Sequence, residues 1–132
     1  SGEWAGYVDS YIGNEDDEIL VGTMIENQRA VENIDEILDI PQLGFAFVGA
    51  ADLSISLSGG DPLADTEDAV DEAIDRARQA ALSADIPLGR IKNSVPEARE
   101  AAEAGYQILR IGGDLSAARA VLGDRLDALD DK

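Results

Sequence analysis

The chain has 132 residues, 28 of them acidic and 10 basic, which gives a formal net charge of −18. It contains no cysteine and no histidine, so disulfides, thiolate metal sites and histidine-based catalysis are excluded within these residues. Hydrophobic residues make up 45%, enough for a packed core, and the negative charge disfavours nucleic acid and anionic membranes as partners.

The first half of the chain alternates helical and extended apolar patterns. Trp4, Tyr7 and Tyr11 recur at helical spacing and predict a helix over residues 3–13, with these aromatic side chains in a core or an interface. The elements predicted after it are a buried strand over 19–25, a helix over 30–38 stopped by Pro41, and a strand over 44–49.

The second half repeats the alternation. A helix over about 64–83 precedes a short strand over 88–91, and Ser94 is predicted to cap the next helix. That helix ends at Gly105, before a strand over 106–111. In the last helix the apolar side chains are expected to face inward: Val121, Leu122, Leu126 and Leu129.

This order predicts one α/β unit over residues 1–132, with a parallel sheet covered by helices. Four parallel strands fit either a small open sheet or half of an eight-stranded barrel. Periodicity alone does not distinguish these two architectures.

Two acidic residues stand at the ends of neighbouring predicted strands. Glu26 ends the first strand, and Asp52 follows the second across Gly49, Ala50 and Ala51. Parallel folds carry their sites at these strand ends, and two carboxylates there suit octahedral Mg²⁺ or Mn²⁺, with water and substrate as further ligands. The alternative is local capping, Glu26 of a helix near Asn27 and Asp52 of a turn near Ser54.

Two segments in this region resemble the HpcH/HpaI aldolase family. Residues 24–38 read MIENQRAVENIDEIL, and residues 47–57 read FVGAADLSISL. The family typically has (V/M)-x-E-x-x-x-A-(V/L)-E-N near the fifth barrel strand and G-P-x-D-L-S-x-S-L after the sixth. Both motifs occur here in that order, with Ala50 in place of the usual proline.

The resemblance implies the C-terminal half, about strands 5–8, of a TIM (βα)₈ barrel. It implies metal-dependent retro-aldol cleavage of 2-keto-3-deoxy or 4-hydroxy-2-oxo acids to pyruvate and an aldehyde. Glu26 and Asp52 would hold Mg²⁺ or Mn²⁺, a Lewis acid for the enolate of pyruvate. The backbone at Gly49, Ala50, Ala51 and Asp52 would hold the pyruvate carboxylate.

The family's histidine base and substrate arginine normally come from earlier strands. Because this sequence has no histidine, no catalytic residue is assigned in it, and the isolated chain is expected to be inactive. A cytoplasmic enzyme is expected, completed by a missing N-terminal half-barrel or by homo-oligomerisation. Within the first strand, one set of side chains should line the inner face, Leu20, Gly22 and Met24, and the other should meet the helices, Ile19, Val21, Thr23 and Ile25.

Other functions fit parts of the sequence. A citrate-lyase-β or malyl-CoA-lyase-like enzyme would also place metal on a Glu and an Asp, and a half-barrel could serve only as a binding or assembly module. Lys92 is a candidate for a Schiff base, against a solvated loop residue. Arg90 and Arg110 either orient an acidic substrate or, the favoured reading, pair with nearby acids. Gly112 and Gly113 with Asp114 suggest tight packing rather than a phosphate loop.

The acidic residues are spread along the whole chain, and only Lys92 and Lys132 are lysines. Such acid-rich, lysine-poor surfaces are typical of proteins that stay soluble in molar salt, where self-repulsion is screened. The composition therefore predicts adaptation to high salt.

Overall fold

The computed structural model describes residues 19–61 and 63–130, so the predicted helix over 3–13, with its aromatic residues, lies outside the described part. Four parallel strands form one sheet in the order β1-β2-β3-β4, which confirms the predicted arrangement. The strands are β1 (Val21–Ile25), β2 (Leu43–Val48), β3 (Leu88–Lys92) and β4 (Ile108–Ile111). The helices are α2 (Gln28–Glu32), α3 (Ile34–Leu38), α4 (Ala50–Leu57), α5 (Glu67–Ala84), α6 (Val95–Glu103) and α7 (Asp114–Asp130).

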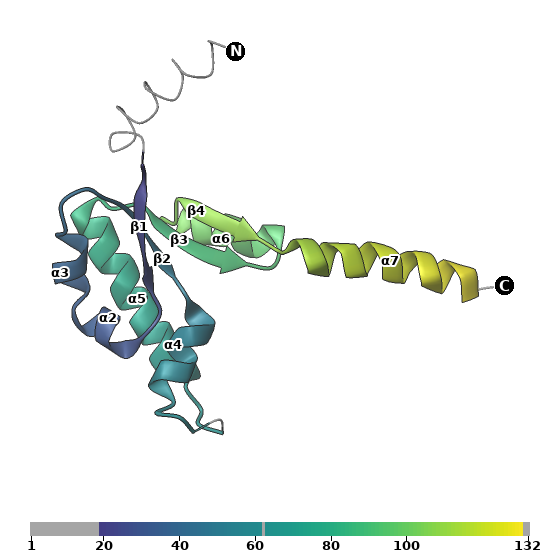
Figure 1. Ribbon diagram of the computed structural model, residues 1–132, viewed down its shortest axis with the longest axis horizontal. Helices are drawn as coiled ribbons and strands as arrows, with labels where there is room; N and C mark the ends of the chain where they lie inside the picture. Colours follow the sequence, from purple (N-terminus) through teal and green to yellow (C-terminus); the bar gives the residue numbers. More distant parts are fainter. Residues whose placement is uncertain (1–18, 62, 131–132) are drawn as a thin grey trace, which may run out of the picture.

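One face of the sheet is covered by helices, as Figure 1 shows for α5 behind β1 and β2. The pairing places Ile25 beside Val48, and both are almost fully buried. Small and branched side chains fill the space between this face and the helices because strand and helix must approach closely. The core includes Ala46 and Leu88 from the strands and Ile34, Leu38, Ala77 and Ala81 from the helices.

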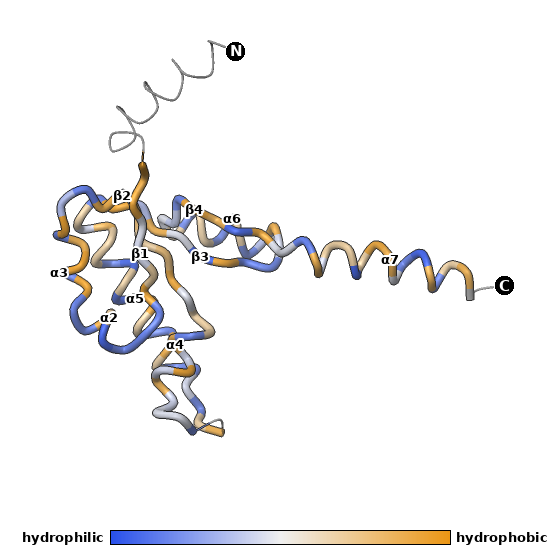
Figure 2. The backbone as a smooth tube through the Cα atoms, in the orientation of Figure 1, coloured by the Kyte–Doolittle hydropathy of each residue, from blue (hydrophilic) through white to orange (hydrophobic). Residues whose placement is uncertain are grey.

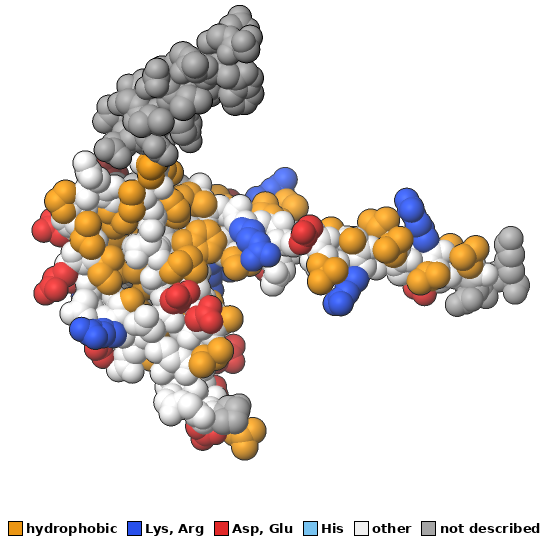
Figure 3. All heavy atoms as spheres, in the orientation of Figure 1, with side chains coloured by type: hydrophobic (Ala, Val, Ile, Leu, Met, Phe, Trp, Pro, Cys, Tyr) orange, Lys and Arg blue, Asp and Glu red, His pale blue; other side chains and the backbone are white. Residues whose placement is uncertain are grey.

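The other face of the sheet is open. Met24 pairs with Phe47, and Phe47 with Gly89, so these residues share that face. Met24 is 46% exposed and Leu20 67% exposed, as predicted for an inner barrel face, whereas Ile25 meets the helices. Figure 3 shows hydrophobic side chains gathered over the strands. The expectation for Ile19 and Val21 is wrong, because both are more than half exposed beside the irregular pairing of Val21 with Leu43.

The region predicted as one helix after β1 forms two. Asn33 ends α2 and precedes α3, and its side-chain amide donates to the Arg29 carbonyl at 2.7 Å. The Asn33 backbone N–H donates to the same carbonyl at 3.1 Å, and the break is at Asn33 itself, whose φ of −103° and ψ of 22° are not helical. The other predicted boundaries agree within a few residues, and Ser94 does cap α6 by accepting from the Glu97 N–H.

Helix α4 was not predicted, because Ser and Ile alternate in its sequence and favour helix weakly. Leu53 is fully buried in the core, and Ser54 is hydrogen-bonded to Thr66 at 2.7 Å. Tertiary packing therefore overrides local propensity here. Ala50, Ala51 and Asp52, proposed from the sequence to hold the pyruvate carboxylate, form the first turn of this helix.

The prediction that the last helix faces inward is wrong. Helix α7 extends away from the sheet (Figure 1), and apolar residues recur along it (Figure 2). A periodic pattern specifies an apolar side but not the element that covers it. The exposed large residues on α7 are Leu115, Val121, Leu122, Leu126 and Leu129. Within residues 19–61 and 63–130, no helix has the length and apolarity needed to cross a membrane.

Candidate metal and substrate site at the strand ends

Glu26 directly follows β1 and is half-buried. The cap of the next helix is Asn27, whose side-chain oxygen accepts from the Ala30 N–H at 2.9 Å. The capping role considered for Glu26 therefore belongs to its neighbour. Glu26 is two residues beyond Met24, so its side chain points to the same, open face of the sheet.

Gly49 provides the space that the Glu26 side chain occupies. A Cβ at position 49 would lie 2.9 Å from the Glu26 Cβ and 3.3 Å from its Oε2. Real side chains essentially never make the first of these approaches, so any larger residue would displace the carboxylate. Gly49 is itself fixed by its N–H, which donates to the Ile25 carbonyl at 3.0 Å. The ends of β1 and β2 thus hold the Glu26 carboxylate above a glycine.

Asp52 lies in the first turn of α4, for which Gly49 is the N-cap. The first hydrogen bond of this helix runs from the Leu53 N–H to the Gly49 carbonyl at 3.0 Å. The N–H groups of Ala50, Ala51 and Asp52 precede that bond, and they make no hydrogen bond to another described residue. A helix start of this kind favours a carboxylate ligand. Asp52 is exposed and does not cap the turn near Ser54.

The donor set suits a hard divalent cation. Among the described residues, neither carboxylate takes part in an ion pair or a hydrogen bond, so both are available. No group of three or more acidic, His or Cys side chains comes together within residues 19–61 and 63–130. Two carboxylates would leave the remaining positions to water and substrate, as Mg²⁺ usually requires in enzymes. The residues present therefore fit the ion that the motifs imply.

The cations of the strands lie on different faces. Lys92, the last residue of β3, lies on the same face of the strand as Arg90 and Leu88, and Leu88 is buried against the helices. Lys92 is thus on the face opposite Glu26, which disfavours a Schiff base with a substrate held at Glu26. Arg110 of β4 pairs with Ile91 and lies on the open face.

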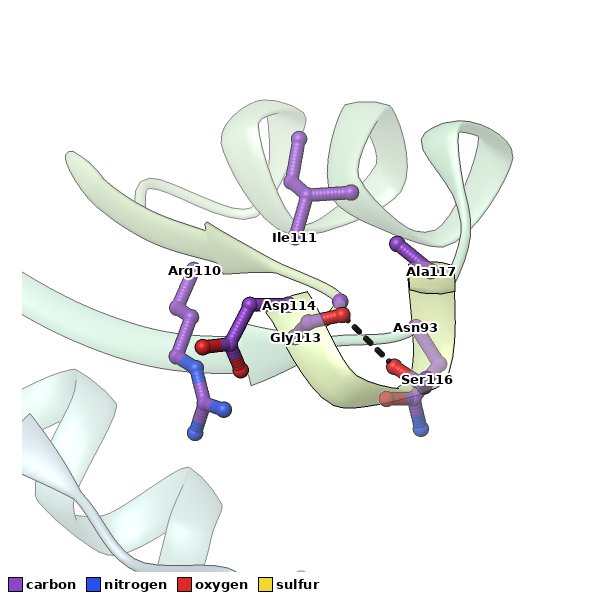
Figure 4. A pocket seen from close by; sticks show the side chains of 8 residues that line it. Asn93, Arg110, Ile111, Gly113, Asp114, Ser116 and Ala117 are labelled. Atoms are coloured by element: carbon purple, nitrogen blue, oxygen red, sulfur yellow. Dashed lines mark hydrogen bonds between the residues drawn. The ribbon is translucent and has the colours of Figure 1, made fainter. Parts of the chain in front are cut away.

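Arg110 also lines a hollow of about 750 Å³ at the ends of β3 and β4, together with Asn93 and Ser116. Figure 4 shows Arg110, Asp114 and Ser116 around this hollow, with a hydrogen bond of 2.8 Å from the Ser116 hydroxyl to the Gly113 carbonyl. Sequence reasoning identified Arg110 and the two glycines but missed Asn93 and Ser116. Asn93 follows β3 and Ser116 lies in the first turn of α7, so their proximity depends on how β3 and β4 pair, which no local pattern indicates.

Tyr106, just before β4, is another residue that sequence reasoning missed. It is 5% exposed, and its hydroxyl has no hydrogen-bond partner among the described residues. Burial raises the pKa of Tyr106, and the positive charge of Arg90 opposes this rise only in part. The ring belongs to the core on the covered face, away from Glu26.

Comparison with known proteins identifies the family. Residues 4–120 match the model of the family described as HpcH/HpaI aldolase/citrate lyase. The chain is 34% identical over 123 residues to the hydroxypyruvate/pyruvate aldolase of Rhizorhabdus wittichii, covering 89% of this chain and 49% of that protein. It is 33% identical over 81 residues to the 2-keto-3-deoxy-L-rhamnonate aldolase of Klebsiella pneumoniae, covering 60% of this chain and 30% of that protein.

A solved structure agrees with these matches. The HpcH/HpaI aldolase/citrate lyase family protein from Burkholderia cenocepacia superimposes with a TM-score of 0.82 at 27% identity, covering 96% of this chain and 48% of that one. The chain spans about half the length, or less, of the curated relatives it matches. Its four βα units correspond to part of their TIM-barrel-like fold. The chain belongs to the HpcH/HpaI aldolase/citrate lyase family.

Proposed function

We propose that this chain supplies the metal and pyruvate cradle of a divalent-metal-dependent aldolase that cleaves 2-keto-3-deoxy or 4-hydroxy-2-oxo acids to pyruvate and an aldehyde. The observation that carries the proposal is the pair of unengaged carboxylates, Glu26 and Asp52, after neighbouring parallel strands, with Gly49 making room for Glu26. The two curated relatives described above are named as aldolases.

Each residue of the proposed site has a separate role. Glu26 and Asp52 hold Mg²⁺ or Mn²⁺, which when bound supplies Lewis-acid stabilisation of negative charge on the keto oxygen of pyruvate. The N–H groups of Ala50, Ala51 and Asp52 donate to the pyruvate carboxylate, and the N-terminal end of α4 favours that negative charge. Gly49 keeps the Glu26 carboxylate in place while C–C cleavage proceeds above the strand ends.

Proton transfer is not assigned to these residues, because the sequence has no histidine. The open face also needs a cover, since Leu20, Met24 and Ile91 are 67%, 46% and 41% exposed. We propose that an N-terminal half-barrel or a second copy of the chain covers it in the active assembly. Light scattering in high salt tests this, and a monodisperse species at the mass of one 13.9 kDa chain would contradict it.

Metal binding is tested by isothermal titration with Mn²⁺. The wild-type chain should bind at one site, and Glu26→Gln should abolish binding because one of two protein ligands is lost. Glu36 is exposed on α3, and Glu36→Gln is therefore the matched control, which should bind Mn²⁺ as the wild type does. Equal binding by Glu26→Gln and the wild type would overturn the assignment.

Activity is tested on the completed barrel. Pyruvate release should stop with EDTA and survive borohydride in the presence of substrate, because no imine forms. Trapping of substrate on Lys92 by borohydride would replace the metal mechanism with a Schiff base. Metal binding without pyruvate release would leave a non-catalytic binding module.

A further inference from the structure

We infer that Arg110 is a specificity-determining residue that selects aldehyde partners carrying a terminal anion, a carboxylate or a phosphate. This inference rests on the proposed function, in which Glu26 and Asp52 would hold the metal beside bound pyruvate. It adds the chemical class of the second substrate.

Strand pairing places Arg110 on the same face as the proposed site. Met24, Phe47, Gly89 and Ile108 form one row across the sheet. A Cβ on Gly89 would lie 3.1 Å from the Ile108 Cβ, which confirms that the two positions share a face. Arg110 is two residues beyond Ile108 and therefore has the same orientation. In Figure 4 it points away from α6, whereas Ile111 points toward that helix.

Arg110 lies at the same end of the parallel strands as Glu26. Both residues are at the C-terminal ends of their strands, and β1 and β4 are three strand spacings apart. At about 4.8 Å per spacing, the two strand ends are separated by at most about 14 Å along the sheet. The distance suits a substrate with pyruvate at one end and a charged group at the other.

Among the described residues, the guanidinium of Arg110 makes no ion pair. The ion pairs there are Arg76 with Asp35 and Arg78 with Asp75. Asp114, which lines the same hollow, instead accepts from the Leu115 N–H at 2.8 Å. The Arg110 Nη2 lies 3.2 Å from where a Cβ on Gly113 would be, so the glycine leaves room for the guanidinium at the hollow. The structural pairing favoured from the sequence is thus absent from the described part.

The charge distribution makes this arginine selective. The three charged residues within the four strands are all cations, Arg90, Lys92 and Arg110, and only Arg110 is on the open face. A molecule with a net charge of −18 repels anions in general. A preference for an anionic partner over a neutral one therefore requires a local cation, and a guanidinium binds carboxylate or phosphate through paired hydrogen bonds.

The test compares matched aldehydes in the aldol direction, with pyruvate and Mn²⁺, on the completed barrel. One series ends in a carboxylate and has two to five carbons, and each member is matched by the neutral aldehyde of the same length. Glyceraldehyde 3-phosphate against glyceraldehyde distinguishes phosphate from carboxylate. Arg110→Ala should lower kcat/KM for the anionic partners by about 10- to 100-fold, mainly through KM, and change the neutral partners by less than about threefold.

Two further variants serve as controls. Arg110→Lys should restore part of the preference because it keeps the charge but loses the paired geometry. Arg99→Ala removes an exposed cation from α6 and should leave both series unchanged. An equal loss for anionic and neutral partners in Arg110→Ala, or no anion preference in the wild type, would overturn the inference and leave the aldolase function standing.

A binding measurement separates failure of the inference from failure of the function. In the 132-residue chain, butyrate should shift the backbone amide resonances of Gly112 and Gly113, and butanol should not. The shifts should disappear in Arg110→Ala. Inactivity with every aldehyde, with the butyrate shifts present, would refute the aldolase proposal and support the anion subsite. Absence of the shifts in the wild type would refute the subsite.

Discussion

The two faces of the sheet differ in what their residues do. On the covered face, Ile25 and Val48 are almost fully buried under helices whose outer surfaces carry exposed acids. On the open face, Met24 and Ile91 are exposed, and Glu26 and Arg110 stand at the strand ends. The covered face therefore accounts for the stability of the chain, and the open face carries the proposed chemistry.

The difference shows how one sheet separates two requirements. Burial excludes water and fixes the strands, so a fully buried charge without a partner would be costly on the covered face. Among the described residues, none of the buried side chains in that core is charged. The open face keeps charged groups accessible but leaves apolar surface without a cover. Experiments that change one face at a time test this division.

The largest effect is expected from salt. Between about 0.1 and 3 M KCl, screening of the acids should raise the melting temperature, because the Debye length falls from about 10 Å to 3 Å or less. Calorimetry over the salt series measures this rise, and a flat or falling melting temperature would contradict salt adaptation.

Repeating those melts over a range of protein concentrations assigns the salt effect to a face. A shift that is independent of concentration arises from the acids on the covered side. A shift that grows with concentration arises from association of the open face, because mass action then stabilises the assembled form.

Truncation of neighbouring residues in β1 should follow next in size. Ile25→Ala removes a fully buried side chain and should lower the free energy of unfolding by about 2–5 kcal/mol. Met24→Ala, on the open face, should cost less than about 1 kcal/mol in the unassembled chain, since its side chain is 46% exposed. Urea melts measure both, and equal losses would mean that the open face is packed in solution.

A smaller effect is expected from removal of the Tyr106 hydroxyl alone. Tyr106→Phe removes a buried hydroxyl that has no partner among the described residues and should leave stability unchanged or raise it by up to about 1–3 kcal/mol. Tyr106→Ala loses the ring as well and should destabilise by about 3–5 kcal/mol. A clear loss of stability in Tyr106→Phe, measured by urea melts, would show that the hydroxyl has a partner.

The smallest effect concerns Asp75 on the outer surface of α5. A hydrogen bond from Arg78 lowers the pKa of Asp75 below its ordinary value. A lowered folded-state pKa adds stability above the unfolded pKa, and this contribution is lost as pH falls through the folded value. The melting temperatures of wild type and Asp75→Asn should therefore differ at pH 7 and converge at about pH 3 or below. Asp71→Asn, also exposed on α5, serves as control and should show no such convergence.

The sequence predicted the parallel order of the strands and the alternation of most β1 residues, because period-two burial is a local property. It also placed Glu26 and Asp52 at strand ends. It did not predict α4, since the burial of Leu53 and the bond between Ser54 and Thr66 involve distant residues. The position of α7 and the hollow beside Arg110 also depend on how elements pack, which periodicity does not encode.

The glycines at positions 22 and 89 have a consequence for how this sequence can evolve. A Cβ on Gly22 would overlap the ring of Phe45, and one on Gly89 would overlap the ring of Phe47. Each glycine and its aromatic neighbour on β2 form a pair in which the order of substitution matters. Replacing Phe45 by a smaller residue first opens a space that an alanine at position 22 can then fill, whereas the reverse order passes through a clash. The permitted mutational paths through the sheet are therefore directional, and recombination between relatives could join an alanine at position 22 to an intact Phe45.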